Sequence, residues 1–166
     1  MNFKKSQRRF NLSTSEWILV SPQHTKRPWQ GKVEISDDKI ESDFEKDCYL
    51  CPGNIWANGD TNHFYNSTFV FENDFSVLKR NITESAINEE IFKAKSEKGI
   101  CRVVRFSPKH NLILVELDTK EIVNVIRTLQ NENSTFSSEP YIKYVQIFEI
   151  KGGIMGCSNP HPHVQT

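Results

Sequence analysis

Residues 156–165 constrain this chain more than any other segment, because they read Gly-Cys-Ser-Asn-Pro-His-Pro-His-Val-Gln. His161 and His163 are separated by one residue, so on an extended strand both side chains project from the same face. Pro160 and Pro162 lack a backbone N–H and fix φ, which suits an edge strand or a rigid strand of an active site. The alternative is a proline-broken loop with surface histidines, and the remainder of the chain favours the first interpretation.

Cys48 and Cys51 form a C-x-x-C motif in a chain with four cysteines. The basic residues 1–9 are not followed by an apolar signal core, so we expect a cytoplasmic protein, in which metal or redox use is favoured over structural disulfides. A redox motif would want a helix directly after the first cysteine, and Pro52 with Gly53 argue against that helix. The motif is therefore typical of half a tetrahedral zinc site, with a pair of ordinary buried thiols as the alternative.

The other half of such a site would come from histidines. His110 lies in a break between two predicted strands and His161 lies next to prolines, so both could be held rigidly. A Cys2His2 site can be assembled in this way, but spacing alone leaves the choice of histidines open. The candidates are His24, His63, His110, His161 and His163.

A histidine outside the metal site could act on phosphorus. If His161 is a ligand, His163 remains two residues further on and faces the same side. A neutral imidazole is a good nucleophile near neutral pH, and it forms a phosphoramidate that is readily transferred onward. Gly156, Ser158 and Asn159 lie just upstream and are residue types whose donors can approach a phosphate closely. The metal would then be structural and would keep His163 aimed.

Composition restricts the partners of the chain. Its 166 residues provide for one domain with a core of its own. The 21 basic and 21 acidic residues balance, which gives no electrostatic footprint for nucleic acid or for an anionic membrane surface. No apolar run approaches the length of a membrane span. We therefore expect a protein that binds neither nucleic acid nor membranes.

Hydrophobic periodicity predicts strands on either side of a single helix. Apolar residues from Ile122 to Leu129 form a helical stripe, with Asp118 or Thr119 as the N-cap. Polar composition predicts an arm and a loop, at 1–16 and 79–98. Strands are predicted at 17–20, 68–71, 75–78, 100–106, 112–115 and 141–150, followed by the motif segment. This order predicts an α+β domain with a mostly antiparallel sheet and a flanking helix.

Several segments match one known family in its order and cover nearly the whole chain. They are RRFN at 8–11, WILVSP at 17–22, KRPWQG at 26–31, CYLCPGN at 48–54, FENDF at 71–75, RV at 102–103 with FSPKH at 106–110, and MGCSNPHPH at 155–163. The last is followed by Gln165 and is highly specific. With these motifs the chain resembles the N-terminal half of galactose-1-phosphate uridylyltransferase, a branch of the histidine-triad superfamily.

The resemblance implies a histidine-triad-like fold, with residues 1–166 as the N-terminal domain and half of a two-repeat transferase. It implies a ping-pong reaction in galactose metabolism. UMP passes from UDP-glucose to a histidine, glucose 1-phosphate leaves, and UMP then passes to galactose 1-phosphate. It also implies zinc as the cofactor and a homodimer.

Roles for single residues follow from the matched motifs. The resemblance implies that His163 is the nucleophile, that Gln165 binds the transferring phosphoryl group, and that Ser158 contacts the phosphates. Arg27 resembles an arginine that reaches a phosphate in the partner subunit's site. The implied zinc ligands are Cys48, Cys51, His110 and His161. The implied substrate-binding residues, besides Arg27, are Leu50, Asn73, Asp74 and Asn159.

Three positions depart from the family pattern. His24 stands where the family commonly has arginine, Ile150 where it has asparagine, and Val164 where it has a small residue. Ile150 cannot hydrogen-bond a phosphate, whereas Val164 is tolerated if its side chain points to the opposite face. The family's enzymes are also longer, with a second half that completes the sheet. Two other hypotheses therefore stay open: a non-catalytic, zinc-stabilised fragment that binds a nucleotide or a partner chain, and a histidine-triad-like nucleotide hydrolase.

Overall fold

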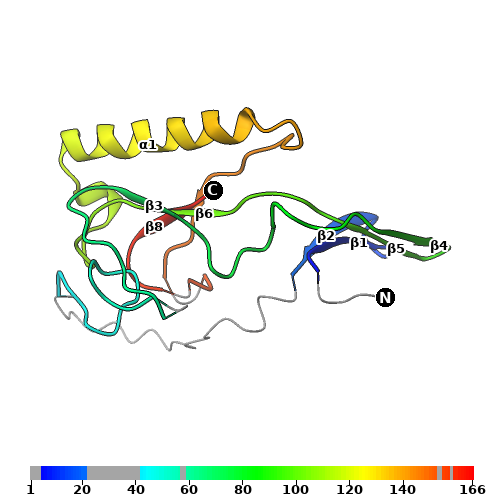
Figure 1. Ribbon diagram of the computed structural model, residues 1–166, viewed down its shortest axis with the longest axis horizontal. Helices are drawn as coiled ribbons and strands as arrows, with labels where there is room; N and C mark the ends of the chain where they lie inside the picture. Colours follow the sequence, from blue (N-terminus) through cyan, green and yellow to red (C-terminus); the bar gives the residue numbers. More distant parts are fainter. Residues whose placement is uncertain (1–4, 22–41, 57–58, 153–154, 158) are drawn as a thin grey trace.

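The computed structural model describes residues 5–21, 42–56, 59–152, 155–157 and 159–166. Within these ranges the strands form two antiparallel sheets of four strands each, and helix α1 (Thr119–Ser137) lies against the second (Figure 1). The first sheet has the order β2–β1–β5–β4, with bounds β1 Gln7–Asn11, β2 Glu16–Val20, β4 Ala86–Glu89 and β5 Phe92–Ser96. The second has the order β3–β6–β8–β7, with bounds β3 Phe69–Glu72, β6 Arg102–Arg105, β7 Phe148–Glu149 and β8 His163–Gln165. The predicted α+β class is confirmed.

Strands of the first sheet lie within the predicted arm at 1–16 and the predicted loop at 79–98, so both predictions are wrong in part. β1 pairs with β2 on one side and with β5 on the other, and these backbone hydrogen bonds define polar strands without an apolar periodicity. β4 turns into β5 through Glu90 and Ile91, with Glu90 at φ 42°. A two-residue hairpin loop normally carries Asn or Gly at such a position. This hairpin therefore lacks the usual turn signal in its sequence.

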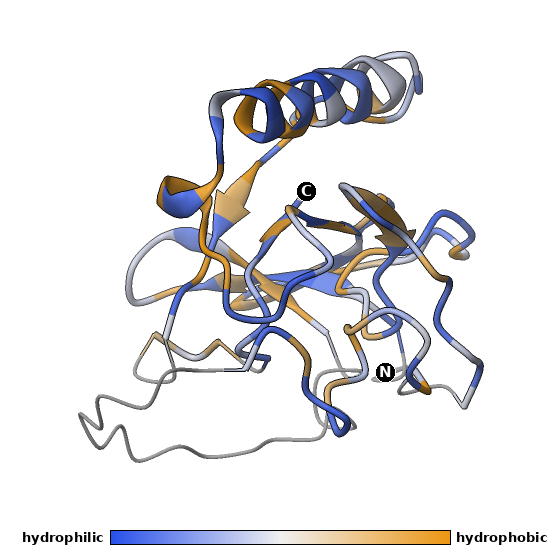
Figure 2. Cartoon of the chain, turned by 90° about the vertical axis from the view of Figure 1, so that its left-hand side faces the viewer, coloured by the Kyte–Doolittle hydropathy of each residue, from blue (hydrophilic) through white to orange (hydrophobic). Residues whose placement is uncertain are grey.

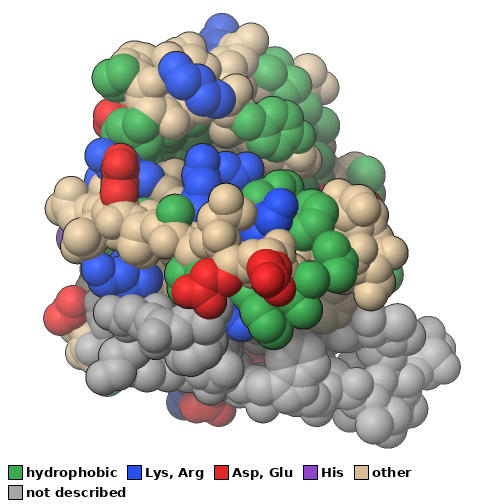
Figure 3. Space-filling view, turned by 90° about the vertical axis from the view of Figure 1, so that its right-hand side faces the viewer, with side chains coloured by type: hydrophobic (Ala, Val, Ile, Leu, Met, Phe, Trp, Pro, Cys, Tyr) green, Lys and Arg blue, Asp and Glu red, His purple; other side chains and the backbone are tan. Residues whose placement is uncertain are grey.

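The first sheet extends away from the rest of the molecule and carries large hydrophobic side chains on its surface. Figure 3 looks at the end toward which it extends and shows hydrophobic side chains beside Lys, Arg, Asp and Glu. Trp17, Ile18 and Leu19 of β2 are 46%, 47% and 41% exposed. Trp17 packs across the strands on Phe10 with ring centroids 5.5 Å apart. Strand pairing and cross-strand contacts thus hold this sheet.

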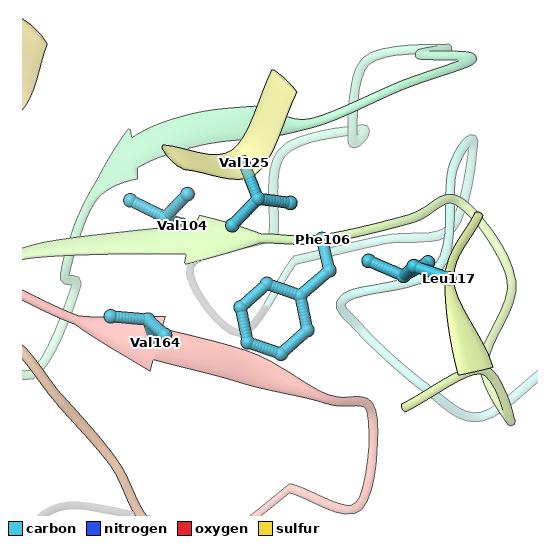
Figure 4. Close-up of a cluster of buried hydrophobic side chains, with 5 residues drawn as sticks. All are labelled: Val104, Phe106, Leu117, Val125 and Val164. Carbon is cyan, nitrogen blue, oxygen red and sulfur yellow. The ribbon is translucent and has the colours of Figure 1, made fainter. Parts of the chain in front are cut away.

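The main hydrophobic core lies between α1 and the second sheet. Val104 of β6 and Val164 of β8 pack with Val125 of the helix, and Phe106 and Leu117 complete the cluster (Figure 4). Figure 2 shows hydrophobic and hydrophilic segments alternating along the helix, with hydrophobic strand segments beneath it. The helical stripe predicted from the sequence therefore packs against the sheet.

α1 begins at its predicted cap and continues beyond its predicted end. The Asp118 carboxylate accepts the Glu121 N–H at 2.8 Å, and the Glu121 carboxylate accepts the Asp118 N–H at 3.0 Å, which forms a capping box. The last turns add the buried side chains of Glu132 and Phe136, and Glu132 pairs with Arg102 of β6 at 2.9 Å. Tertiary contacts therefore extend the helix. Among the described residues, no helix has the length and apolar character needed to cross a membrane.

Three predicted strands differ from the structure. Residues 75–78 form turns and bends, and residues 112–115 lead into a 3-10 helix at Leu114–Glu116. Leu112 and Leu114 pack against the main core, so their apolar character serves packing outside a strand. Only Phe148–Glu149 of the predicted strand 141–150 pairs, with β8. Composition marked these segments as apolar without fixing their backbone.

Alternation along β6 and β8 separates the core from the face that carries the motif residues. Val104 pairs with Val164, and both side chains belong to the core beneath α1. Their strand neighbours, among them His163 and Gln165, therefore project from the opposite face. Val164 thus points away from His163, as the sequence analysis required for its departure from the family pattern.

Val104 provides a direct test of this core. We expect Val104→Ala to lower the free energy of unfolding by about 2 kcal/mol, because it removes buried methyl groups and leaves a cavity. Val115→Ala is the matched control, since Val115 is 83% exposed while Val104 is 0% exposed. Urea denaturation of both variants measures the difference. Equal midpoints would contradict the placement of Val104.

Candidate active site

Residues 48–54 form a tight turn that brings two cysteine side chains together. The Cys51 N–H donates to the Cys48 carbonyl at 3.0 Å, and the Asn54 side chain donates to the same carbonyl at 2.8 Å. Gly53 has φ +79°, and a Cβ at this position would lie 2.7 Å from the Phe64 ring. Glycine is therefore favoured by this left-handed conformation, whereas the Phe64 ring is 88% exposed and can move aside. The turn directs the thiols inward, and Cys51 is fully buried.

Cys48, Cys51, His110 and His161 form a buried cluster whose four ligand atoms lie within 4.8 Å of one another. His161 Nδ1 is 3.6 Å from Cys51 Sγ and 3.9 Å from Cys48 Sγ. His110 Nδ1 is 3.5 Å from Cys51 Sγ. In a tetrahedral zinc site with Zn–S near 2.3 Å and Zn–N near 2.1 Å, sulfur and nitrogen ligands lie ~3.6 Å apart. The donor set and its spacing therefore fit a four-coordinate metal ion.

Backbone carbonyls orient the ring of His161 and anchor the main chain of His110. His161 Nε2 lies 3.1 Å from the Ser107 carbonyl, which can only accept a hydrogen bond. The proton is therefore on Nε2, and the lone pair of Nδ1 points to the thiols, as a metal ligand requires. His110 follows β6, and its backbone N–H donates to the Asp43 carbonyl at 2.9 Å. Segments distant in sequence thus fix the cluster.

The two thiols differ in acidity. Burial raises the pKa of Cys48, but hydrogen bonds with His110 and His161 outweigh it and lower that pKa to about 5. Burial raises the pKa of Cys51 to about 11, and the adjacent Cys48 thiolate adds to this shift because a second negative charge is repelled. One thiolate is therefore available at neutral pH before any metal binds. A bound divalent cation would favour ionisation of the second thiol, that of Cys51.

A pocket lies beside the cluster, on the face of the second sheet opposite α1. Tyr49, Phe71 and Phe75 give it an aromatic wall, which suits a planar base, and polar side chains converge on the same space. Every described residue predicted to take part in catalysis or substrate binding lines this pocket. These residues are Leu50, Asn73, Asp74, Asn159, His163 and Gln165.

The tautomer of His163 is set by its own strand. Its Nδ1 lies 2.8 Å from the His161 carbonyl, which accepts the Nδ1 proton. The lone pair is therefore on Nε2. β8 pairs with β6 through His163 and Arg105, so the position of the ring is fixed by the sheet. A buried imidazole with an oriented lone pair at the edge of a pocket can act as a nucleophile.

Two asparagines predicted to bind substrate also make structural hydrogen bonds. Asn159 Oδ1 accepts the His161 N–H at 2.8 Å, and Nδ2 of the same amide lies 3.7 Å from Cys48 Sγ. Asn159 therefore braces the Cys48–Cys51–His110–His161 cluster while it lines the pocket. Asn73 Oδ1 accepts the Phe75 N–H at 3.0 Å, so the Nδ2 group is the part of this side chain that can be offered to a ligand.

Arg27 and Ser158, both predicted to contact phosphate, lie outside the described residues, as does His24. Their predicted roles stay predictions.

Arg105 is the residue of this region that the sequence analysis missed. It is fully buried, and its guanidinium carbon lies 4.4 Å, 5.2 Å and 4.9 Å from the ring centroids of Tyr65, Phe69 and Phe71. Burial lowers the pKa of Arg105 to about 10, so it stays charged at neutral pH. The available signal was an arginine inside the apolar run from Val103 to Phe106.

Asp74 predicts a pH-dependent stability. Burial, with a smaller contribution from repulsion by Asp60, raises the pKa of the Asp74 carboxyl above its usual 3.8. The unfolded chain releases this proton at lower pH than the folded chain, so stability falls as pH rises through the raised pKa. We therefore expect Asp74→Asn to raise Tm at neutral pH and to leave it unchanged below both pKa values. Asp60→Asn should give a smaller gain. A lower Tm for Asp74→Asn at neutral pH would contradict this.

The whole chain, residues 1–166, matches the family model for galactose-1-phosphate uridyl transferase, N-terminal domain. The chain belongs to the galactose-1-phosphate uridylyltransferase family. A galactose-1-phosphate uridylyltransferase of Kluyveromyces lactis is 45% identical over 175 residues, which cover 97% of this chain and 47% of the relative. One of Haemophilus influenzae is 40% identical over 159 residues, which cover 95% and 45%. The resemblance found in the sequence is thus confirmed.

Solved structures show the same fold. A uridylyltransferase structure has a TM-score of 0.69 at 24% identity, and the match covers 96% of this chain and 44% of that chain. An ADP-glucose phosphorylase from Arabidopsis thaliana with bound ADP-glucose has a TM-score of 0.53 at 21% identity, over 97% and 48%. These two matches confirm the predicted α+β fold class. The chain spans about half the length of the galactose-1-phosphate uridylyltransferases it matches.

Proposed function

We propose that this chain is the N-terminal, nucleophile-bearing domain of an enzyme that transfers UMP from UDP-glucose to galactose 1-phosphate. The observation that supports the proposal most is the setting of His163. Its Nδ1 proton is held by the His161 carbonyl, and the ring lines the pocket that also contains Leu50, Asp74 and Gln165. Membership of the family supports the choice of substrates.

In the first half-reaction, His163 Nε2 attacks the α-phosphorus of UDP-glucose. A P–N bond forms, the bond from that phosphorus to the bridging oxygen breaks, and glucose 1-phosphate leaves with the bonding electrons. The proton stays on Nδ1 and is donated to the His161 carbonyl, which stabilises the positive charge that develops on the ring. In the second half-reaction, a phosphate oxygen of galactose 1-phosphate attacks the same phosphorus, and Nε2 departs with its lone pair restored.

Donors around the phosphorus would stabilise the transition state. Gln165 lies two residues after His163 and projects from the same face, so its amide can donate to a phosphoryl oxygen. Ser158 precedes this strand, and we propose that it donates to the sugar phosphate. Losing one such donor typically costs about 3 kcal/mol of transition-state stabilisation.

The metal cluster has a structural role in this proposal. Cys48, Cys51, His110 and His161 would hold zinc, whose tetrahedral coordination would fix the turn and the start of β8 relative to each other. His161 would link the cluster to the nucleophile, because the carbonyl of the same residue orients His163. We also propose that the protein forms a homodimer, in which Arg27 reaches a phosphate in the partner subunit's site.

Intact-protein mass spectrometry after incubation with UDP-glucose tests the proposal. We expect a gain equal to one uridylyl group, and we expect galactose 1-phosphate to remove it with formation of UDP-galactose. Steady release of UMP without an acceptor would favour a nucleotide hydrolase. No gain in protein that holds its metal would favour a non-catalytic nucleotide-binding domain. Either result would overturn the proposal that this domain forms a uridylyl adduct and passes it to a sugar phosphate.

A further inference from the structure

Arg105 is a buried charge that the proposed chemistry does not use. Arg105 is fully buried, and its guanidinium packs against the rings of Tyr65, Phe69 and Phe71. It is not among the residues that line the pocket. Burying an arginine in this way is costly unless its donors are satisfied and its charge is used. Its Nε has no hydrogen-bond partner among the described residues, so the cost is only partly offset.

The donors of Arg105 lead to the turn that carries the two cysteines. Nη1 donates to the Tyr65 hydroxyl at 2.8 Å, and Nη2 donates to Asn62 Oδ1 at 3.2 Å. The Tyr65 hydroxyl donates to the Leu50 carbonyl at 2.9 Å. The Asn62 amide donates to the Leu50 carbonyl at 3.1 Å and to the Cys51 carbonyl at 2.7 Å. The guanidinium thus organises two side chains that clamp this turn.

The same turn serves both the cluster and the pocket. Cys51 contributes a thiol to the metal cluster, and Leu50, which is 4% exposed, lines the pocket. The backbone of Arg105 lies opposite His163 in the pairing of β6 with β8. A single residue therefore spans from the strand of the nucleophile to the turn that holds a metal ligand and a pocket wall.

We propose that Arg105 is a positioning residue that couples the metal cluster to the nucleotide pocket, acting through Asn62 and Tyr65 on the carbonyls of Leu50 and Cys51. Its rigid planar fork of donors holds the two intermediaries at once in a fixed geometry, which the rotating point charge of a lysine ammonium does not reproduce. The coupling to the pocket rests on the proposed function, whereas the coupling to the metal does not.

Cobalt(II) binding to the chain tests the coupling of Arg105 to the metal cluster without any catalytic readout. Tetrahedral thiolate coordination gives an absorption spectrum that reports both affinity and ligand set. We expect Arg105→Met to weaken Co²⁺ binding by about 10- to 100-fold, the usual range for residues that orient metal ligands. Arg105→Lys should recover only part of the loss. Tyr65→Phe, which removes one hydroxyl, should also weaken Co²⁺ binding, but to a lesser extent.

Arg102→Met is the matched control, because Arg102 lies on the same strand but pairs with Glu132 of α1. This control should lower thermal stability and leave the Co²⁺ affinity and spectrum unchanged. If Arg105→Met fails to fold, Tyr65→Phe decides the outcome. Parental Co²⁺ affinity and spectrum in whichever of the two variants is folded would overturn the proposal.

The dependence of uridylylation on UDP-glucose concentration tests the coupling to the pocket. We expect Tyr65→Phe to raise the UDP-glucose concentration needed for half-maximal uridylylation several-fold, with a smaller effect on the maximal rate. If the parent chain forms no adduct, the proposed function fails while the Co²⁺ result still decides the role of Arg105. An unchanged half-maximal concentration in Tyr65→Phe, with an active parent, would overturn the coupling to the pocket.

Discussion

His163→Gly is expected to abolish formation of the uridylyl adduct and to reduce transfer by a factor on the order of 10⁶, the usual loss when a covalent nucleophile is removed. The reason is that His163 is the one histidine among the described residues that line the pocket, so no other imidazole there can form the P–N bond. Single-turnover assays with UDP-glucose, together with intact-protein mass, measure the loss. The metal content of the variant should equal that of the parent, because His163 does not belong to the cluster.

His63→Gly is the matched control for this prediction. His63 is exposed and lies outside the pocket lining, so its removal should leave adduct formation at the parental level. Equal loss in both variants would mean that histidine-to-glycine changes act through folding. An adduct that persists in His163→Gly would exclude His163 as the nucleophile.

Removing the metal is expected to produce the second large effect. Structural zinc sites contribute apparent binding free energies of roughly 10–16 kcal/mol in small domains. The four buried ligands join the turn at 48–51, the residue His110 after β6 and the segment before β8, so these segments would lose their common anchor. We therefore expect a chelator, or Cys51→Ser, to lower Tm sharply and to abolish uridylylation. Differential scanning calorimetry with metal analysis measures both.

Cys101→Ser serves as the control for the cysteine substitution. Cys101 lies outside the cluster and is half-buried, so its replacement should keep the bound metal and change Tm little. A chain that loses its metal in chelator yet retains its Tm would contradict a structural role for the ion. Equal effects of Cys51→Ser and Cys101→Ser would contradict the assignment of the ligands.

The sequence was sufficient where a residue's own chemistry determines its place. The Asp118 cap, the helical stripe and the strand signals around Val104 depend on local pattern, and the structure confirms them. Cys48 and Cys51 could be read as half a metal site for the same reason. The choice of His110 and His161 among five histidines required the family resemblance, because their proximity arises only from the folded sheet.

The sequence was insufficient where pairing or packing determines the structure. β1, β4 and β5 are polar strands defined by their partners, and the Glu90 turn lacks glycine or asparagine. Arg105 was missed because its partners Asn62 and Tyr65 lie 43 and 40 residues away along the chain. A long-range hydrogen-bond network of this kind leaves only an unusual residue in an apolar strand as its trace.

Identification of the uridylylated residue tests the central claim most directly. The chain would be incubated with UDP-glucose, digested, and analysed by tandem mass spectrometry under conditions that preserve acid-labile phosphoramidates. The account predicts one uridylyl group on His163, lost when galactose 1-phosphate is added before digestion. A uridylyl group on any other residue, or its absence from metal-loaded protein, would contradict the account.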